Sequence, residues 1–523
     1  MWTEGWRNRF QQAASTRFDV LVIGGGITGA GVALEAARAG LRVALVEQND
    51  FASGTSSGSS KLVHGGLRYL ASGDWRLTRE SVRERQRLMH DVPGLVDPLD
   101  FMMPVYRGDK PGRWPLRAAL ALYDLMAGKR YSRYLDPPAF SGHMPYLRDT
   151  ELRGGFVYRD AQTDDARLTL RVLAEAIDHG ALAANYVRAE SLVFENNDAA
   201  GARLADAVSG ERFTLSAACV VNATGPWTDR LRASVDGAPQ LRPLRGSHFV
   251  FDFHTLPVAR AITLFHPQDR RPLFAIPWQG ATVFGTTDLD HDASMDAVPR
   301  MSVEESDYLI DAARHYFPAL DLSAGAAISS YAGVRPVVQG EPGASASEES
   351  RESAIDVERG LITVTGGKLT TFRVTAHDVL SRVGEVLGRE PLIDPNRAII
   401  NTRVAGGIPK SEAERVHRYG PGYTRMLDAP VAGDDERLGA TDYCLRELRF
   451  ALACEAVEHL DDLLLRRTRA GLLLPGGGVH ELHRIEALCR DALGWDANRW
   501  QQEVERYLEH WRAVHAPVRV ADE

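Results

Sequence analysis

Apolar positions near the start of the chain fall into two short runs separated by small residues. Residues 18–23 form the first run and residues 41–46 the second, and the stretch between them is rich in glycine and alanine. This order is typical of a strand, a turn, a helix and a second strand. The pattern therefore predicts an α/β unit at the beginning of the chain.

The middle of the chain has a different pattern, with short apolar runs close together. Between residues 243 and 290 these runs cover Ser247–Phe253, Leu273–Trp278 and Ala281–Thr286. The last two are separated by Gln279-Gly280, a two-residue spacer that favours a β-hairpin. We expect an antiparallel sheet in this part of the chain.

Helical spacing dominates from about Glu412 to the end. In Tyr443–Ala470 the apolar residues recur at i, i+3 and i+4, the period of one helix face. The segment Glu341–Ser353 is rich in Glu, Ser and Gly, which indicates an exposed loop. The tail is predicted to form a separate helical domain.

Composition narrows the functional classes. The chain has 523 residues and a net charge of −9, which predicts two or three structural units and argues against general nucleic-acid binding. The four cysteines are far apart and include no CxxC pair, so we expect a reducing compartment and no metal site. With neither a secretory leader nor an apolar stretch of about 18 residues, we also expect no membrane span.

The turn after the first apolar run carries Gly24-x-Gly26-x-x-Gly29, with Gly25 inside it. This spacing permits a tight turn, close approach of the backbone to a pyrophosphate and close packing of helix on strand. Glu47 ends the second run and is placed to accept the ribose hydroxyls of an adenosine. Because the motif follows a strand and opens a helix, it predicts a dinucleotide site rather than a glycine-rich surface turn. At this point NAD and FAD both stay open.

Residues 53–70 read Ser-Gly-Thr-Ser-Ser-Gly-Ser-Ser-Lys-Leu-Val-His-Gly-Gly-Leu-Arg-Tyr-Leu. This segment resembles the flavin-contacting segment of the aerobic, respiratory FAD-dependent glycerol-3-phosphate dehydrogenases, members of the D-amino-acid-oxidase-like flavoproteins. Six further stretches match the family in order: Asn222–Trp227, Arg245–His248, Ile276–Trp278, Gly285–Asp288, Tyr331–Pro336 and Gly366–Arg373. The resemblance covers residues 18–400 with specific motifs, and the helical tail more loosely.

The resemblance implies an α/β fold class with a discontinuous Rossmann-like FAD-binding domain, an antiparallel substrate-binding cap and a C-terminal α-helical domain. The expected ranges are 15–95, 150–240 and 325–400 for the FAD-binding domain, 96–149 and 241–324 for the cap, and 401–523 for the helical domain.

FAD is expected to bind along these motifs. A stretch dense in Ser, Thr and Gly offers many backbone N–H donors with little bulk, which suits a diphosphate and a ribityl chain. His64 is expected to pack against the flavin. The residues predicted to line the cofactor are Gly24, Gly25, Gly26, Gly29, Glu47, Thr55, Ser56, Ser59, Lys61, Leu62, His64, Gly65, Gly66, Val187, Thr224, Gly225, Trp227, Gly333, Gly367, Lys368, Leu369 and Thr370.

Oxidation of a phosphorylated alcohol requires cations for the phosphate and a group that takes the hydroxyl proton. Arg68 and Arg335 lie in cofactor-adjacent motifs, and a guanidinium matches phosphate geometry bidentately, so both are assigned to substrate binding. In the family pattern Arg335 lies close to the reacting carbon, which makes it a catalytic candidate as well. Lys368 is expected to act in both roles, and Tyr69 and Thr286 complete the substrate-binding cluster.

His248 is the candidate general base, because an imidazole with a pKa near its usual value of about 6.5 accepts a proton at neutral pH. It stands in the motif Arg245-Gly-Ser-His248. The alternative is a core histidine without a catalytic role, since most of the 16 histidines must be surface or satisfied core residues. The resemblance does not name the base.

Residues 105–134 invert the charge balance of the chain. The cations there are Arg107, Lys110, Arg113, Arg117, Lys129, Arg130 and Arg133, against Asp109 and Asp124. On a helix from about Pro115 to Ala127, an apolar stripe would lie beside these cations; it consists of Trp114, Leu116, Leu120, Tyr123 and Met126. Such a surface suits anionic lipid headgroups, and the resemblance implies a lipid-facing region here.

Two alternatives stay open for this segment and its surroundings. An ordinary amphipathic helix packed on its own core would show the same spacing. A second candidate anchor lies at the start of the chain, where Trp2, Trp6 and Phe10 stand beside Arg7 and Arg9.

The resemblance implies oxidation of sn-glycerol 3-phosphate to dihydroxyacetone phosphate, with electrons passed to a membrane quinone at the cytoplasmic face of the inner membrane. The rival is a glycerol-3-phosphate oxidase, which passes the same electrons to oxygen as hydrogen peroxide; the basic segment favours the quinone enzyme. A non-catalytic flavin-binding or tRNA-modifying protein would leave Arg68, Arg335 and Lys368 unexplained. The number of subunits stays open, with a homodimer among the options.

Overall fold

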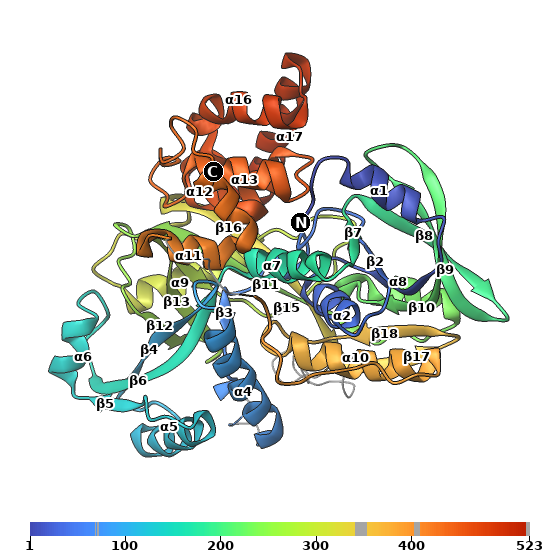
Figure 1. Ribbon diagram of the computed structural model, residues 1–523. Coiled ribbons are helices and arrows are strands. Elements are labelled where there is room, and N and C mark those ends of the chain that lie inside the picture. Colours follow the sequence, from blue (N-terminus) through green and yellow to red (C-terminus); the bar gives the residue numbers. More distant parts are fainter. Residues whose placement is uncertain (68–69, 71–72, 340–352, 402–407, 519–523) are drawn as a thin grey trace.

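The computed structural model describes residues 1–67, 70, 73–339, 353–401 and 408–518. Figure 1 shows two sheets with helices packed on them and a helical domain at the C-terminal end of the chain. The predicted loop at residues 341–353 lies outside the described residues except for Ser353. The mixed α/β architecture and the helical C-terminal domain confirm the predicted fold class.

The first sheet has the strand order β17-β18-β10-β1-β2-β7, and β9 joins β10 to β8 at its side. Its strands are β1 (Phe18–Ile23), β2 (Val43–Val46), β7 (Leu182–Ala184), β8 (Val187–Glu195), β9 (Asp198–Asp206), β10 (Arg212–Asn222), β17 (Ala354–Glu358) and β18 (Leu361–Thr365). The central neighbours β18, β10, β1, β2 and β7 all pair in parallel. Their carboxyl ends therefore meet at one edge.

Strand β1 is covered on both faces, which explains its unbroken apolar run. Val20 and Val22 belong to the core cluster that includes residues of α2 (Ile27–Arg38), α7 (Asp165–Asp178) and α10 (Phe372–Leu387). Leu21 and Ile23 belong to the cluster on the opposite face, with β8 and β9. Continuous apolar runs are typical of parallel strands buried in this way.

The second sheet has the order β15-β11-β14-β13-β12-β4-β6-β3, with β16 paired to β11 and β5 paired to β6. Its strands are β3 (Leu62–Val63), β4 (Val96–Tyr106), β5 (Arg133–Leu135), β6 (Leu152–Thr163), β11 (Leu241–Asp252), β12 (Ala261–Phe265), β13 (Pro272–Trp278), β14 (Ala281–Gly285), β15 (Leu289–Asp290) and β16 (Ala327–Val338). Every pairing in it is antiparallel except that of β12 with β4.

The predicted hairpin is present between β13 and β14. Gln279 and Gly280 both have positive φ, +49° and +81°, as a two-residue turn between antiparallel strands requires. Two long strands inside the ranges predicted for the FAD-binding domain, β6 and β16, lie in the second sheet. Both sheets therefore draw on residues of that predicted domain.

The remaining helices cover the sheets or form the C-terminal domain. Around the sheets lie α1 (Trp6–Ala13), α4 (Trp75–Asp91), α5 (Arg113–Ala127), α6 (Pro137–His143), α8 (Thr228–Arg232) and α9 (Val303–Tyr316). The C-terminal domain contains α11 (Lys410–Tyr419), α12 (Thr424–Asp428), α13 (Leu445–Cys454), α14 (Leu460–Asp462), α15 (Ala470–Leu473), α16 (Leu482–Leu493) and α17 (Ala497–Val514). No helix among the described residues is long and apolar enough to cross a membrane.

The segment Tyr443–Ala470 is not one helix, although its spacing favoured one. Helix α13 ends at Cys454, Ala456 has a φ of +49°, and a short π-helix at Leu463–Arg467 follows α14. Its apolar residues still face inward, because Leu448, Leu460 and Leu463 share a core with Phe101 and Tyr158 of the second sheet.

Helix α5 has the predicted position but a different orientation. Leu120 and Tyr123, expected in the lipid-facing stripe, are each only 1% exposed and pack into the core. The exposed apolar side chains are Trp114, at 67%, and Leu125, at 76%. The prediction of a lipid-facing stripe was therefore wrong for Leu120 and Tyr123, because their face of α5 packs on the protein core.

The second candidate anchor, at the start of the chain, was wrong. Trp2 and Phe10 are buried, and the Trp2 indole Nε1 donates to the Ala183 carbonyl at 2.8 Å. Arg7 forms an ion pair with Asp206. These aromatic side chains fix α1 to the first sheet.

Candidate active site

A cavity of about 1010 Å³ lies where the carboxyl ends of the parallel strands meet the second sheet. It is lined by residues at the ends of β1, β2 and β10 and in the loop after β18, together with residues of β4, β13 and β16. Open α/β sheets bind their ligands at this edge. The volume is at the upper end of the range for ligand sites.

The glycine turn between β1 and α2 forms one wall. A Cβ atom on Gly24 would lie 2.4 Å from the Ala223 carbonyl oxygen, and one on Gly29 would lie 2.0 Å from the Gly24 carbonyl oxygen. The turn can therefore pack this closely only with glycine. Gly26 caps α2 and lines the cavity with Ile27, so the positive end of the α2 dipole faces the space.

Glu47, directly after β2, lines the same end of the cavity. Its carboxylate accepts from the Gly25 N–H at 2.7 Å and from the Asn49 N–H at 2.9 Å. Burial raises the pKa of Glu47 in spite of these two hydrogen bonds. The carboxylate is thus held in a fixed orientation beside the glycine turn.

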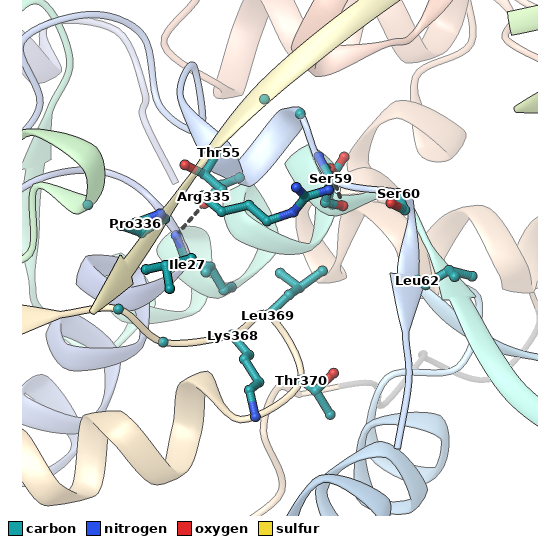
Figure 2. Close-up of a pocket in the computed structure, with 18 of the residues that line it drawn as sticks. Ile27, Thr55, Ser59, Ser60, Leu62, Arg335, Pro336, Lys368, Leu369 and Thr370 are labelled. Atoms are coloured by element: carbon teal, nitrogen blue, oxygen red, sulfur yellow. Dashed lines mark hydrogen bonds between the residues drawn. The ribbon is translucent and has the colours of Figure 1, made fainter. Parts of the chain in front are cut away.

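The cavity segment, residues 53–62, runs along the length of the space (Figure 2). The Ser56 hydroxyl accepts from the Ile27 N–H at 2.9 Å, which ties the segment to the N-terminus of α2. Thr55 donates to the Val334 carbonyl at 2.5 Å, which ties it to β16. The segment therefore bridges the two sheets.

Arg335 and Thr286 meet in another part of the cavity wall. The Arg335 guanidinium donates to Thr286 Oγ1 at 2.7 Å and to Asp288 Oδ1 at 3.0 Å, and all three residues line the cavity. A Cβ atom on Gly246 would lie 2.2 Å from Arg335 Nη2. The glycine of the Arg-Gly-Ser-His motif therefore makes room for the guanidinium.

Lys368 lines the cavity without joining this group. Figure 2 shows its side chain extending from the loop after β18 away from Arg335. Burial raises the pKa of Glu80, and the charge of Lys368 partly offsets this, so Lys368 lies on the α4 side. Arg68 and Tyr69 lie outside the described residues.

His248 does not face the cavity. It is 1% exposed, stacks on Tyr331 at 4.8 Å between ring centroids, and its Nε2 lies 2.8 Å from Ser60 Oγ. Burial, with the charges of Arg335 and Lys61, lowers the pKa of His248 well below its usual value. The imidazole is therefore neutral and reaches the cavity only through Ser60, which lines it.

Residues 19–379 match the family model described as FAD dependent oxidoreductase. The chain belongs to that family. Residues 374–500 match a second model, the C-terminal domain of alpha-glycerophosphate oxidase.

Relatives and solved structures agree with this membership. The aerobic glycerol-3-phosphate dehydrogenase of Bacillus subtilis is 34% identical over 484 residues, which is 86% of this chain and 87% of the relative. The enzyme of that name from Staphylococcus aureus strain USA300 is 37% identical over 485 residues, 86% of each chain. The glycerol-3-phosphate dehydrogenase of Bacillus halodurans, solved with FAD, superposes with a TM-score of 0.80 at 28% identity and 98% coverage of both chains.

A more distant structure shares the fold. The L-alpha-glycerophosphate oxidase of Mycoplasma pneumoniae, solved with FAD bound, has a TM-score of 0.57 at 16% identity, covering 74% of this chain and 98% of that one.

The cofactor of this FAD dependent oxidoreductase is FAD, and the residues present fit it. The α2 N-terminus and the glycine turn suit a pyrophosphate, and Glu47 suits the adenosine ribose. Most of the predicted cofactor residues line the cavity: Gly24, Gly26, Glu47, Thr55, Ser56, Ser59, Leu62, His64, Gly66, Val187, Thr224, Gly225, Trp227, Gly333, Gly367, Lys368, Leu369 and Thr370.

Lys61 does not line the cavity, contrary to prediction. Its side chain is fully buried, and its ammonium lies 3.0 Å from Asp165 and 2.6 Å from the Ser57 carbonyl. The φ of Lys61 is +60°, and this turn directs the side chain behind the cavity segment. Lys61 therefore supports the segment from the protein interior.

Three predicted glycines also lie behind the cavity wall. Gly25 and Gly29 pack within the turn: a Cβ on Gly25 would lie 2.8 Å from Glu47 Cβ. A Cβ on Gly65 would lie 2.3 Å from the Tyr123 hydroxyl. All three allow close packing and do not face the cavity.

Two acidic residues near Arg335 were not predicted from the sequence, and one of them, Asp288, binds its guanidinium. Asp288 accepts from Arg335, and Glu305 accepts from the hydroxyls of Ser247 and Thr287 at 2.9 and 2.6 Å. Asp288 ends the motif Gly285–Asp288, which was the available signal. Glu305 lies on α9, where only the capping pattern Ser302-x-x-Glu305 marks it.

An apolar arm extends the main cavity toward α5. It is lined by Phe101 and Met103 of β4 and by Leu116, Ala119 and Leu120 of α5. Side chains of this kind suit a hydrophobic ligand rather than a phosphate.

A second cavity, the basic cavity, lies between α5 and β5 and measures about 710 Å³. Its cations are Arg117, Lys129, Arg130 and Arg133, and Ala121 and Leu125 line it as well. In the described part of the chain none of these four cations forms an ion pair. Asp124, the acid at this site, is buried and accepts from Ser132.

Proposed function

We propose that this chain oxidises sn-glycerol 3-phosphate at C2 to dihydroxyacetone phosphate. The observation that carries the proposal is the oriented guanidinium of Arg335 inside the FAD cavity, in a chain that is 34–37% identical to enzymes named aerobic glycerol-3-phosphate dehydrogenase. A guanidinium binds phosphate or a developing alkoxide by charge-assisted hydrogen bonds. A non-catalytic flavin protein would have no use for this residue.

The roles of the residues follow from their positions. FAD, when bound, accepts the hydride from C2. Arg335, fixed by Thr286 and Asp288, orients the substrate and stabilises negative charge on the C2 oxygen. Lys368 extends toward a different part of the cavity, where it contributes a further positive charge for the substrate.

His248 receives the hydroxyl proton through Ser60 Oγ in this proposal. A base with a pKa well below its usual value is weak at neutral pH, and His248 is such a base. Stabilisation of the alkoxide by Arg335 therefore contributes more to the rate than proton removal does.

Anaerobic mixing of the yellow holoprotein with sn-glycerol 3-phosphate tests cofactor, substrate and chemistry together. We expect loss of the visible absorbance of oxidised flavin, and formation of one dihydroxyacetone phosphate for each flavin reduced. Glycerol should be a very poor substrate, because the phosphate supplies binding energy that orients C2. A flavin that stays oxidised with glycerol 3-phosphate would refute the proposal.

We further propose a quinone as electron acceptor, reached at a membrane surface. The apolar arm between the cavity and α5 supports a hydrophobic acceptor. Its rival is oxygen, as in an oxidase. Quinone-analogue reduction without hydrogen peroxide supports the quinone, and stoichiometric peroxide in air supports the oxidase.

Peripheral attachment to an anionic membrane, at the cytoplasmic face of the inner membrane, completes the proposal. The exposed Trp114 and Leu125 lie on α5, the helix that forms one side of the basic cavity. Each cation near an anionic surface contributes about 1 kcal/mol, and the apolar side chains add a part that salt does not weaken.

A further inference from the structure

Three arginines of the C-terminal helical domain reach into the FAD-binding part of the chain. We call Arg466, Arg467 and Arg469 the arginine turn, because they lie at the end of the π-helix and just before α15. Their side chains are 9%, 0% and 2% exposed. Three charges buried this completely need partners. Each of the three has an acidic partner in the first half of the chain, and Arg466 also pairs with Asp461 and Asp462 of the helical domain.

Arg469 is bound to the start of α7. Its Nε donates to Asp164 Oδ1 at 3.1 Å, and its Nη2 donates to Asp165 Oδ1. The same Nη2 lies 3.4 Å from the Ser57 carbonyl. Arg469 therefore contacts the cavity segment both directly and through Asp165.

Asp165 transmits this contact to a residue that lines the cavity. Its Oδ2 accepts from the Ser59 N–H at 3.0 Å and from the Ser59 hydroxyl at 2.7 Å. The ammonium of Lys61 also donates to Asp165 at 3.0 Å, and to the Ser57 carbonyl at 2.6 Å. The carboxylate thus fixes the cavity segment at residues 57–61.

The other two arginines hold the chain before the cavity segment. Arg466 and Arg467 both donate to the fully buried carboxylate of Asp50. Asp50 lies between Glu47 and Ala52, which both line the cavity. Burial opposes ionisation of Asp50, but the two guanidiniums outweigh it and lower the pKa of Asp50. One short stretch of the helical domain therefore anchors both ends of residues 50–61.

The final residues of the helical domain support the same region from β16. The Ser330 N–H donates to the His515 carbonyl at 2.8 Å, and the Ser329 hydroxyl donates to the Leu472 carbonyl at 2.7 Å. Tyr331, next along β16, donates to the Ser59 carbonyl at 3.0 Å. Ser59 is thus held from two sides by elements that pack on the helical domain.

We propose that the arginine turn is the latch by which the C-terminal helical domain holds FAD in place, with Arg469 as a positioning residue for the cavity segment. Loss of Arg469 leaves Asp164 and Asp165 buried with fewer cations, so the segment rearranges to solvate them and FAD retention falls. The proposal rests on the FAD site and does not depend on the substrate.

The rate of FAD release from the holoprotein tests this proposal. After dilution, the appearance of free flavin fluorescence gives the dissociation rate for the wild type, Arg469→Met and Arg469→Lys. The control is Arg171→Met: Arg171 is 1% exposed and pairs with Glu175 on α7 at 3.4 Å, and neither residue lines the cavity. Circular dichroism gives the unfolding temperature of each variant, and the visible spectrum of the loaded proteins reports the flavin environment.

We expect Arg469→Met to release FAD at least about tenfold faster than the wild type, because the variant loses both buried ion pairs of Arg469, with Asp164 and with Asp165. Arg469→Lys keeps the charge and should recover part of the retention, with a shifted flavin spectrum at full loading. Arg171→Met should lower the unfolding temperature but release FAD within about twofold of the wild type.

Two results would overturn the latch. One is wild-type FAD retention in both Arg469 variants. The other is equally fast release from Arg171→Met, which would make FAD loss a consequence of general destabilisation. If Arg469→Met does not fold, the release rate and spectrum of Arg469→Lys decide, and wild-type values for both would refute the proposal. Because substrate is absent from this assay, its outcome is separate from that of the glycerol 3-phosphate test.

Discussion

At the scale of single residues, the substrate end of the cavity depends on how Arg335 is held. The arginine side chain is long and flexible, yet Asp288 and Thr286 fix the two terminal nitrogens of its guanidinium, and Gly246 leaves the space that the group fills. A charge fixed in advance does not have to be ordered when the reaction begins. Removal of the Arg335 side chain and displacement of it can therefore be tested by two different variants.

Replacement of Arg335 by alanine should lower kcat/KM for sn-glycerol 3-phosphate. The loss of transition-state stabilisation should be about 2 kcal/mol or more, the scale for removing one partner of a desolvated charge pair. FAD content should be unchanged. The matched control is Arg242→Ala on β11, whose ion pair with Asp290 lies outside the cavity lining. Near-normal kinetics in the Arg335 variant would remove the residue from the mechanism.

Gly246→Ala should act on Arg335 indirectly. The new Cβ would lie 2.2 Å from Arg335 Nη2 and 2.6 Å from Thr286 Oγ1, so the guanidinium must move. We expect roughly a tenfold loss of kcat/KM, about 1.4 kcal/mol, with FAD retained. Gly325→Ala serves as control, because no atom lies within 4 Å of its added Cβ. Equal kinetics for the two variants would show that the position of Arg335 is unimportant.

At the scale of elements, local patterns predicted some features well and others poorly. The β1–α2 turn and the Gln279-Gly280 hairpin depend on nearby residues, so the sequence was sufficient for both. The orientation of α5 was not predictable, because the partners of Tyr123 are Asp160 and Arg85, far away in the chain. The break after Cys454 likewise depends on tertiary contacts of α13 and α14.

The same limit applies to the candidate site. Most of the residues that the motifs predicted for the cofactor line the cavity, but spacing alone did not reveal that Lys61 turns inward to Asp165. It also did not reveal that Ser60 separates His248 from the cavity. Both features depend on where α7 and β11 lie in the fold.

The exposed face of α5 gives a prediction for this scale. Glutamate at Arg113, Arg117, Lys129 and Arg130 should abolish binding to vesicles of anionic phospholipid, because four exposed attractive charges become repulsive. Turnover with a soluble dye acceptor should persist. A control with the same charge change places glutamate at Arg17, Arg42, Arg212 and Arg382, which are exposed in other parts of the chain. If the first variant still sediments with the vesicles as the control does, the membrane-binding surface lies elsewhere on the protein.

At the scale of the whole molecule, the buried charges between the helical domain and the rest make stability depend on pH. Burial opposes ionisation of Asp164, but Arg469, Arg418 and Arg167 outweigh it and hold its pKa below the usual value. A carboxylate with a lowered folded-state pKa stabilises the protein above its unfolded pKa of about 3.9 and loses this contribution as the pH falls further. Asp462 has a raised pKa of about 6 because it is buried beside Asp50, and it acts in the opposite direction.

A difference measurement isolates Asp164 from these opposing groups. Asp164→Asn should destabilise the protein by about 3 kcal/mol at pH 7, since it removes the charge that pairs with buried Arg469 and with partly exposed Arg418. The gap in unfolding temperature between this variant and the wild type should narrow below about pH 4, because Asp164 of the unfolded wild-type chain then binds a proton while the folded-state carboxylate, with its lowered pKa, stays ionised. Asp462 is present in both proteins, so its pH-dependent contribution to stability largely cancels in the difference. The control, Asp442→Asn, alters a carboxylate that is 81% exposed and should show almost no gap at either pH. A gap for Asp164→Asn that stays constant from pH 7 to pH 3 would mean that its charge does not hold the helical domain in place.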